Sequence, residues 1–117
     1  MKLLRHGNIG AEKPGLLDQN GAIRDLSEHI ADFDAQALSP AGLARLAALD
    51  PASLPLVPSS VRLGAPIPRP GKFIGIGLNY ADHAEEAGLP IPEQPIVFYK
   101  ASSCISGPND DILHPRG

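Results

Sequence analysis

Proline is the residue type that most limits what this chain can fold into. Thirteen of the 117 residues are proline, and a proline inside a helix removes a hydrogen bond and clashes with the preceding turn. The second half is therefore predicted to form short strands separated by rigid turns rather than long helices. The prolines that carry this prediction are Pro51, Pro55, Pro58, Pro66, Pro68, Pro70, Pro90, Pro92 and Pro95.

Composition and charge exclude several classes of protein. A hydrophobic content of 43% with 20% charged residues is typical of a globular domain. The formal net charge is −3 and no run of lysine or arginine occurs, so no nucleic-acid partner is expected. His6, Gly7 and Asn8 interrupt the short apolar start, which predicts neither a signal peptide nor a membrane span. We therefore expect a cytoplasmic protein with no membrane partner.

The single cysteine and three of the four histidines suggest structural roles. Cys104 is the only cysteine, which excludes an internal disulfide and a cysteine-rich metal site. We expect it to be a small buried residue rather than a nucleophile. His6, His29 and His114 are isolated in the sequence and lack the spacing of metal ligands, so we expect surface or partly buried structural side chains.

The first half of the chain has the pattern of a small domain with strands and one helix. Asn20-Gly21 lies between apolar segments and predicts a hairpin over residues 14–26. Ser39 and Pro40 suit a helix N-cap and first helical position, and apolar residues follow at helical spacing as far as residue 49. We also expect a strand at 2–5, a helical turn at 27–30, a proline-spaced linker at 51–58 and a strand at 60–63.

The second half predicts a domain that is not finished within this sequence. Apolar runs at 72–77 and 95–100 predict two buried strands, and residues 79–88 between them predict a short helix capped by Asn79. Residues 106–117 suggest a turn, a short strand and another turn. Two strands alone are only marginally stable in water, so further strands are expected beyond them. We predict domains at 1–65 and 66–117.

His83 and Glu86 are the residues with the clearest chemical potential. Their spacing of three places both side chains on one face of a helix. A carboxylate beside an imidazole orients the ring and raises the basicity of its other nitrogen, as a general base acting on water requires. The spacing alone also fits a solvated surface pair worth about 0.3 kcal/mol. Gly75 and Gly77 before the helix favour a site rooted at a strand end, where catalytic groups are often mounted.

A longer motif surrounds this pair. It reads Gly75-x-Gly77-x-Asn79-Tyr80-x-Asp82-His83-x-x-Glu86 and is followed by Pro95-Ile96-Val97-Phe98-Tyr99-Lys100. The motif resembles the opening of the catalytic domain in the fumarylacetoacetate hydrolase superfamily. The resemblance extends over residues 67–115, and the residues before them resemble the small N-terminal domain of bacterial members. It implies an α+β chain: a small mixed N-terminal domain, then the first strands of a mainly β catalytic fold, truncated before the metal site.

The resemblance also implies an activity. Family members include isomerases of heptadienedioates, fumarylpyruvate hydrolases and ureidoglycolate lyases. The complete enzyme is therefore expected to be a hydrolase, lyase or isomerase of 2-oxo acids, typically cleaving a carbon–carbon bond in an acylpyruvate or 1,3-dicarbonyl compound during the catabolism of aromatic compounds. By this resemblance His83 and Glu86 position and deprotonate water on a lid-like helix, and Lys100 contacts substrate anions or has a structural role. A homodimer is expected.

The resemblance further implies a divalent cation, Mg²⁺ or Mn²⁺, that chelates the oxygens of the substrate. In the family the ligands come from a Glu-x-Glu motif and a later aspartate, all downstream of the segment that matches Ile112 to Pro115. We assign no metal ligand in this chain and expect Asp110 and Asp111 to lie in a solvated loop. The 117-residue chain alone is expected to bind no metal and to be inactive.

A second hypothesis comes from another class of protein. The chain could be a free-standing module that keeps the front of the fold and acts only in binding or scaffolding. A reading frame that continues past Gly117 with Glu-x-Glu soon afterwards favours the enzyme, whereas a stop codon and stable monomeric folding favour the module.

Overall fold

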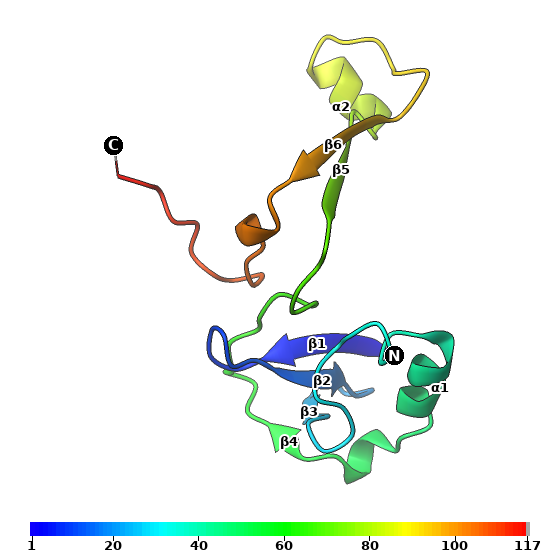
Figure 1. The fold of residues 1–117 in the computed structure, drawn as a ribbon, viewed down its shortest axis with the longest axis vertical. Coiled ribbons are helices and arrows are strands. Elements are labelled where there is room, and N and C mark those ends of the chain that lie inside the picture. Colours follow the sequence, from blue (N-terminus) through cyan, green and yellow to red (C-terminus); the bar gives the residue numbers. More distant parts are fainter. Residues whose placement is uncertain (117) are drawn as a thin grey trace. The chain divides into compact units, whose positions relative to one another are not determined.

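The computed structural model describes residues 1–116 (Figure 1). Contacts divide the chain into two compact units. The first contains Met1–Pro68 and the described residues from Ser106 onward, and the second contains Arg69–Ile105. The domain limits expected from the sequence, 1–65 and 66–117, stay a prediction about the domains of a complete protein. Both units combine short helices with antiparallel strands, so the predicted α+β class is confirmed in its broad sense.

An antiparallel four-stranded sheet forms the centre of the first unit, with the strand order β1-β2-β3-β4 (Figure 1). The predicted hairpin is confirmed, because β2 pairs with β3 across a turn at Asn20-Gly21. Asp18 closes this turn by accepting hydrogen bonds from the backbone N–H groups of Asn20 and Ala22, and Gly21 takes a φ of 77°. The strands are β1 (Lys2–His6), β2 (Lys13–Leu17), β3 (Ile23–Asp25) and β4 (Leu56–Val57).

The predicted helix of the first half is α1 (Pro40–Ala47). The Ser39 side chain accepts a hydrogen bond from the N–H of Gly42, which confirms its role as the N-cap. Gly42 is buried, and a Cβ at this position would collide with the carbonyl oxygens of Gln36 and Ala37. A glycine therefore lets the helix approach the preceding loop. That loop begins with the predicted helical turn, in which Ile30 N–H donates to the carbonyl of Leu26.

A single hydrophobic core lies in the first unit. Residues from two strands, from the loop after β3, from α1 and from the segment after η1 (Pro51–Ser53) meet there. Burying apolar side chains against each other is the dominant favourable term in folding. The buried members are Leu16, Leu26, Phe33, Leu46 and Leu54, with Leu3, Ile30, Leu38 and Leu49 packed around them.

The strand expected at residues 60–63 is wrong. The chain there makes one isolated antiparallel bridge, between Leu63 and His6. The fourth strand instead lies at Leu56–Val57, inside the segment expected to be a linker, where it pairs with Ile23 and Arg24. Proline at 55 and 58 limits this strand to two residues, because proline cannot donate to the ladder.

The second unit is a two-stranded antiparallel sheet with a short helix between its strands. Its elements are β5 (Phe73–Gly77), α2 (Ala81–Glu86), β6 (Ile96–Lys100) and the 3₁₀ turn η2 (Ser102–Cys104). The strands lie where the apolar runs predicted them, but the prediction that they are buried is wrong. Every residue of β6 is exposed, and so are Ile74 and Ile76 of β5. No described element of this unit covers either face of the strands.

Two further expectations for the C-terminal part are wrong. Residues 111–116 form no strand, because no described strand pairs with them, and Ile112 and Leu113 are almost fully exposed. Asp110 does not lie in a solvated loop. Its carboxylate oxygens lie 2.7 and 2.6 Å from Nε and a terminal nitrogen of Arg62, so the two side chains form a bidentate ion pair within the first unit.

Candidate functional site

The strand pair β5–β6 determines where the predicted site residues lie. Gly75 is directly opposite Phe98 in the register. A Cβ on Gly75 would collide with the ring of Phe98. Glycine at this position of β5 therefore leaves room for the Phe98 ring, which extends from β6 over Gly75. Gly77 and Ile96 form the last pair at the end of the ladder next to α2. The strand-end glycine predicted to precede the helix is thus confirmed.

Helix α2 differs from the prediction at its N-terminus. It begins at Ala81, so Tyr80 and not Asn79 occupies the N-cap position, and no side chain caps the helix. The expected Asn79 cap is therefore wrong. The connection from β5 continues one residue further than expected, so the helix begins after Tyr80. Asp82 in the first turn accepts a hydrogen bond from the N–H of His83 at 2.8 Å. Its negative charge at this end also interacts favourably with the positive end of the helix dipole.

The C-terminus of α2 is closed by its own backbone. The N–H of Leu89 donates to the carbonyl of Ala84, and the N–H of Gly88 donates to the carbonyl of Glu85. Gly88 has a φ of 65°. These two bonds with a left-handed glycine make a Schellman motif, which ends the helix and satisfies its last carbonyls. Ala84, only 1% exposed, is the one buried side chain of the helix.

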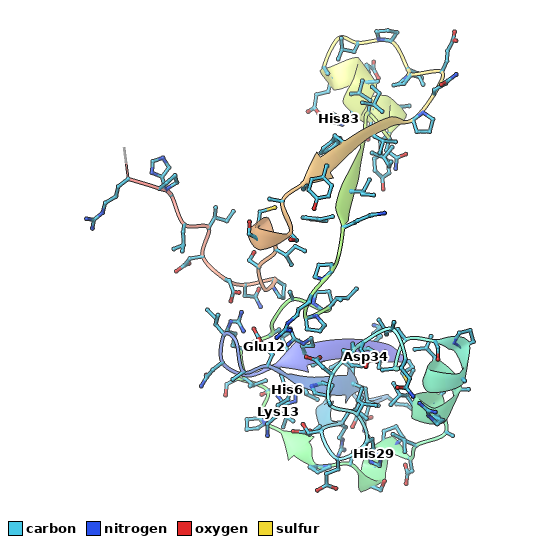
Figure 2. The ribbon with its side chains drawn as sticks, in the orientation of Figure 1. His6, Glu12, Lys13, His29, Asp34 and His83 are labelled. Atoms are coloured by element: carbon cyan, nitrogen blue, oxygen red, sulfur yellow. The ribbon has the colours of Figure 1, made fainter. Side chains whose placement is uncertain are left out.

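His83 and Glu86 both lie exposed on α2 (Figure 2 labels His83). Across residues 1–116 the two side chains share no hydrogen bond and no ion pair. Exposure leaves the imidazole and the carboxylate free to contact a bound molecule, and their spacing still allows the carboxylate to turn toward the ring. The pairing of these residues as base and orienting acid stays a prediction.

Lys100 lies at the end of β6 and is exposed. Its ammonium nitrogen is 5.4 Å from the centre of the Phe73 ring and 5.7 Å from that of Phe98. Both distances are within the range of cation–π contacts. Lys100 therefore has a structural contact inside the second unit, and its predicted role in substrate binding stays a prediction.

A family model now connects this geometry to known proteins. The model described as fumarylacetoacetate (FAA) hydrolase C-terminal matches residues 72–117, a segment that contains β5, α2 and β6. Residues 72–117 belong to the fumarylacetoacetate hydrolase family. The resemblance predicted from the motif is thus confirmed.

Relatives of this chain are longer than the chain itself. A protein of Burkholderia ambifaria is 63% identical over all 117 residues, and one of Burkholderia multivorans is also 63% identical over 117 residues. Both are provisionally named hydrolases. The chain spans 42% of the length of each. The whole-length match includes residues 1–71, which the family model does not cover.

A crystal structure of a protein from Mycobacterium smegmatis, provisionally named HpcE, has the same fold over this region. It matches 98% of the chain with a TM-score of 0.64 and a sequence identity of 25%. The chain covers 41% of that protein. The chain therefore shares its mixed fold of short helices and antiparallel strands with the Mycobacterium smegmatis protein.

The described residues do not suit the metal that the family resemblance implies. Within residues 1–116, no three histidine, cysteine, aspartate or glutamate side chains gather where they could hold an ion. Asp110 is paired with Arg62, and Asp111 is exposed. The described chain therefore does not fit Mg²⁺ or Mn²⁺ by itself.

Cys104 and two of the remaining histidines lie outside any cluster. Cys104 is exposed, so its predicted burial is wrong. It follows the end of β6 on η2, where its thiol donates a hydrogen bond to the carbonyl of Ala101 and no residue of the turn is buried. His29 and His114 are exposed, as expected for isolated histidines.

His6 is the buried exception (Figure 2). It is 4% exposed, and its Nε2 has no hydrogen-bond partner among the described residues. The nearest carboxylate oxygen, on Asp25, is 3.8 Å away. Burial lowers the pKa of His6 below 6.5, the attraction of Asp25 opposes this, and the positive charge of Lys13 adds to the lowering. The uncharged imidazole is therefore the form that the fold favours.

This burial predicts a loss of stability in mild acid. The unfolded chain takes up a proton at His6 near pH 6.5 and the folded chain only at lower pH, so His6 contributes to stability above pH 6.5 and this contribution decreases as the pH falls through the lowered pKa. Urea unfolding between pH 8 and 5 measures the effect. We expect His6→Gln to flatten the curve within this range, and His29→Gln, at an exposed position, to leave it unchanged. An equally steep curve in both variants would assign the acid sensitivity to other groups.

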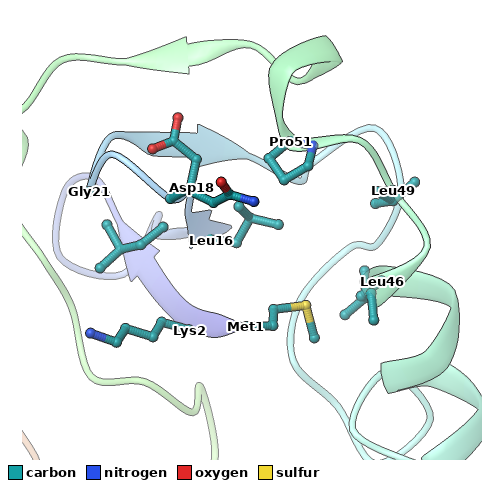
Figure 3. A pocket seen from close by; sticks show the side chains of 11 residues that line it. Met1, Lys2, Leu16, Asp18, Gly21, Leu46, Leu49 and Pro51 are labelled. Atoms are coloured by element: carbon teal, nitrogen blue, oxygen red, sulfur yellow. The ribbon is translucent and has the colours of Figure 1, made fainter.

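An open pocket in the first unit contains none of the predicted site residues. It has a volume of about 650 Å³ and lies between the β1–β2 strands and the end of α1 (Figure 3). Its wall is mainly apolar and includes Leu16, Leu46 and Leu49. Asp18, its only carboxylate, is already paired with Arg24 at 2.9 Å. The pocket therefore offers no unpaired carboxylate.

No helix among residues 1–116 is both long enough and apolar enough to span a membrane.

Proposed function

We propose that this chain is the front part of an enzyme that acts on 2-oxo acids of the acylpyruvate or 1,3-dicarbonyl type, cleaving a carbon–carbon bond by addition of water. Membership of residues 72–117 in the fumarylacetoacetate hydrolase family supports a hydrolase or isomerase type of activity. The provisional hydrolase names of the Burkholderia relatives point in the same direction. The 117-residue chain alone is proposed to be inactive, since it spans 42% of those relatives.

One observation carries the proposal. His83 and Glu86 are both exposed on α2, the α-helix of the segment that matches the family model, and a three-residue connection joins this helix to the end of β5. An imidazole and a carboxylate with this spacing suit the activation of water. They are also free of competing ion pairs within the described chain, so a substrate can approach them.

The proposed reaction has simple chemistry at His83. The imidazole takes a proton from water, and the resulting hydroxide attacks the acyl carbonyl carbon of the substrate. The bond between that carbon and the methylene carbon breaks, the acyl group leaves as a carboxylic acid, and the electron pair moves into the enolate of pyruvate. The imidazolium then returns its proton to the methylene carbon. One water is consumed, and Glu86 stabilises the imidazolium while it carries the proton.

A divalent cation, Mg²⁺ or Mn²⁺, is proposed as the cofactor of the complete enzyme only. Residues 1–116 supply no ligand cluster for it, so no step above depends on the metal. Carboxylate ligands from a longer chain would have to supply the site. A homodimer, a cytoplasmic location, a small-molecule 2-oxo acid as partner, and the absence of nucleic-acid or membrane partners belong to the same proposal.

The proposal is tested with the full-length natural protein and the 117-residue chain side by side. A short acylpyruvate is the substrate, and the loss of its enol absorbance is followed with and without added Mg²⁺ or Mn²⁺. We expect metal-dependent turnover by the longer protein and none by the short chain, together with calorimetric metal binding by the longer protein only. Turnover or tight metal binding by the 117-residue chain would contradict the proposed division of the site.

A non-catalytic binding module is the second candidate, and one observation favours it. The faces of β5 and β6 expose Ile74, Ile76, Val97 and Phe98, and exposed apolar residues that adjoin each other often mark an interaction surface. If the natural reading frame ends at residue 117 and the chain is a stable monomer without turnover, the module explains these faces better than the enzyme.

A further inference from the structure

Leu78 has an unusual backbone conformation directly before the candidate catalytic helix. Its φ is 47°, and no other non-glycine residue among residues 1–116 has a positive φ. In this left-handed region the Cβ of an L-amino acid lies too close to the following carbonyl oxygen, so leucine is a strained choice. Strain of this kind persists only where the surrounding structure imposes it, and it gathers at functional sites.

The position of Leu78 gives this strain a consequence. Strand β5 ends at Gly77 and α2 begins at Ala81, so Leu78 is the first of only three connecting residues. The N-terminus of α2 has no side-chain cap, whereas its C-terminus is held by the bonds of Gly88 and Leu89. The direction in which the helix leaves the strand therefore depends on the backbone path through the connection.

Glycine would be the unstrained residue at this position, so the presence of leucine needs a reason. The Leu78 side chain is half-buried and lines a pocket of about 240 Å³ with Ile76, Asn79, Ile91 and Pro92. A side chain also narrows the range of backbone conformations, whereas glycine adopts positive and negative φ about equally well. Leucine thus holds the connection in one path where glycine would allow several.

We propose that Leu78 is a positioning residue, which holds the β5–α2 connection in a single left-handed path and so determines where α2 presents His83 and Glu86. The inference rests on the proposed function for the role of these two side chains, but the backbone effect can be measured without it.

The test compares two substitutions in the full-length natural protein. Leu78→Gly removes the strain and frees the connection. Leu78→Asn keeps a side chain that tolerates the left-handed region. We expect Leu78→Gly to lower kcat for a short acylpyruvate by about 10- to 100-fold with KM changed less than about 3-fold, because misplacing a catalytic group by about 1 Å can cost that much. Leu78→Asn should recover most of kcat.

A matched control is Leu56→Gly, which makes the same chemical change at an exposed position of β4 where φ is not positive. It should leave kcat unchanged. A second readout is hydrogen exchange at the amide of Ala84, which donates the first hydrogen bond of α2, to the carbonyl of Tyr80. We expect about 10-fold faster exchange in Leu78→Gly and near wild-type exchange in Leu78→Asn.

The outcomes separate this inference from the proposed function. Unchanged exchange at Ala84 in Leu78→Gly, or an equal loss of kcat in the Gly and Asn variants, would overturn the positioning role. If the wild-type protein hydrolyses no acylpyruvate, the proposed function fails, and the exchange comparison alone decides whether Leu78 positions α2.

Discussion

Replacing His83 by glutamine in the full-length natural protein is expected to lower kcat for acylpyruvate hydrolysis by about 10²- to 10⁴-fold, the usual contribution of a general base. Glutamine keeps a polar side chain of similar length, but its amide cannot take a proton from water. Because His83 is exposed and has no side-chain partner in the described chain, the substitution should leave folding unchanged. Steady-state kinetics on the folded variant measure the effect.

The neighbouring glutamates provide the control for this prediction. Glu85 and Glu86 are both exposed on α2, but only Glu86 has the spacing of three from His83 that brings two helical side chains together. We expect Glu86→Gln to lower kcat by about 10-fold and Glu85→Gln to change it by less than about 2-fold, since only the former removes the partner that stabilises a charged imidazole. Equal effects of the two substitutions, or an active His83→Gln protein, would contradict the assignment.

Replacing Leu26 by alanine is expected to lower the free energy of unfolding of the 117-residue chain by about 3 kcal/mol, as is typical of a leucine-to-alanine change in a core. Leu26 is 0% exposed and belongs to the core cluster with Phe33 and Leu46. Removing its isobutyl group leaves a cavity that the surrounding side chains fill only in part. Urea unfolding followed by far-ultraviolet circular dichroism measures the loss, at pH 8 so that His6 remains uncharged.

The same substitution at Leu56 separates burial from residue type. Leu56 lies in β4 and is 66% exposed, so Leu56→Ala removes few contacts and should cost less than about 1 kcal/mol. A loss at Leu56 as large as the loss at Leu26 would mean that the core is not where the structure places it.

Local signals in the sequence were sufficient for most of the elements. Asn20-Gly21 predicted the hairpin because hairpin turns need a residue with positive φ, which glycine supplies readily and which Gly21 adopts. Ser39 and Pro40 predicted the start of α1 because capping depends on residues next to each other in the chain. The motif around His83 was likewise sufficient to predict the family, which the match over residues 72–117 confirms.

Predictions that depended on distant contacts were less reliable. The apolar runs of β5 and β6 were expected to be buried, but burial requires a covering layer, and the described second unit has none. Residues 60–63 had the composition of a strand but found only the single bridge from Leu63 to His6. Asp110 was expected in solvent because nothing in the sequence indicates that Arg62, 48 residues away, lies beside it.

The sequence by itself determined the hairpin turn, the start of α1, the positions of β1, β2, β3, β5 and β6, and the family, because each depends on neighbouring residues or on an ordered motif. Only the tertiary structure decided that His6 is buried with an unpaired Nε2, that Asp110 is paired with Arg62, and that Leu78 takes a left-handed conformation. The first two features arise from contacts between segments distant in the chain. The third is a backbone conformation that leucine rarely adopts and that the surrounding structure imposes. Neither cause leaves a signal in the local sequence.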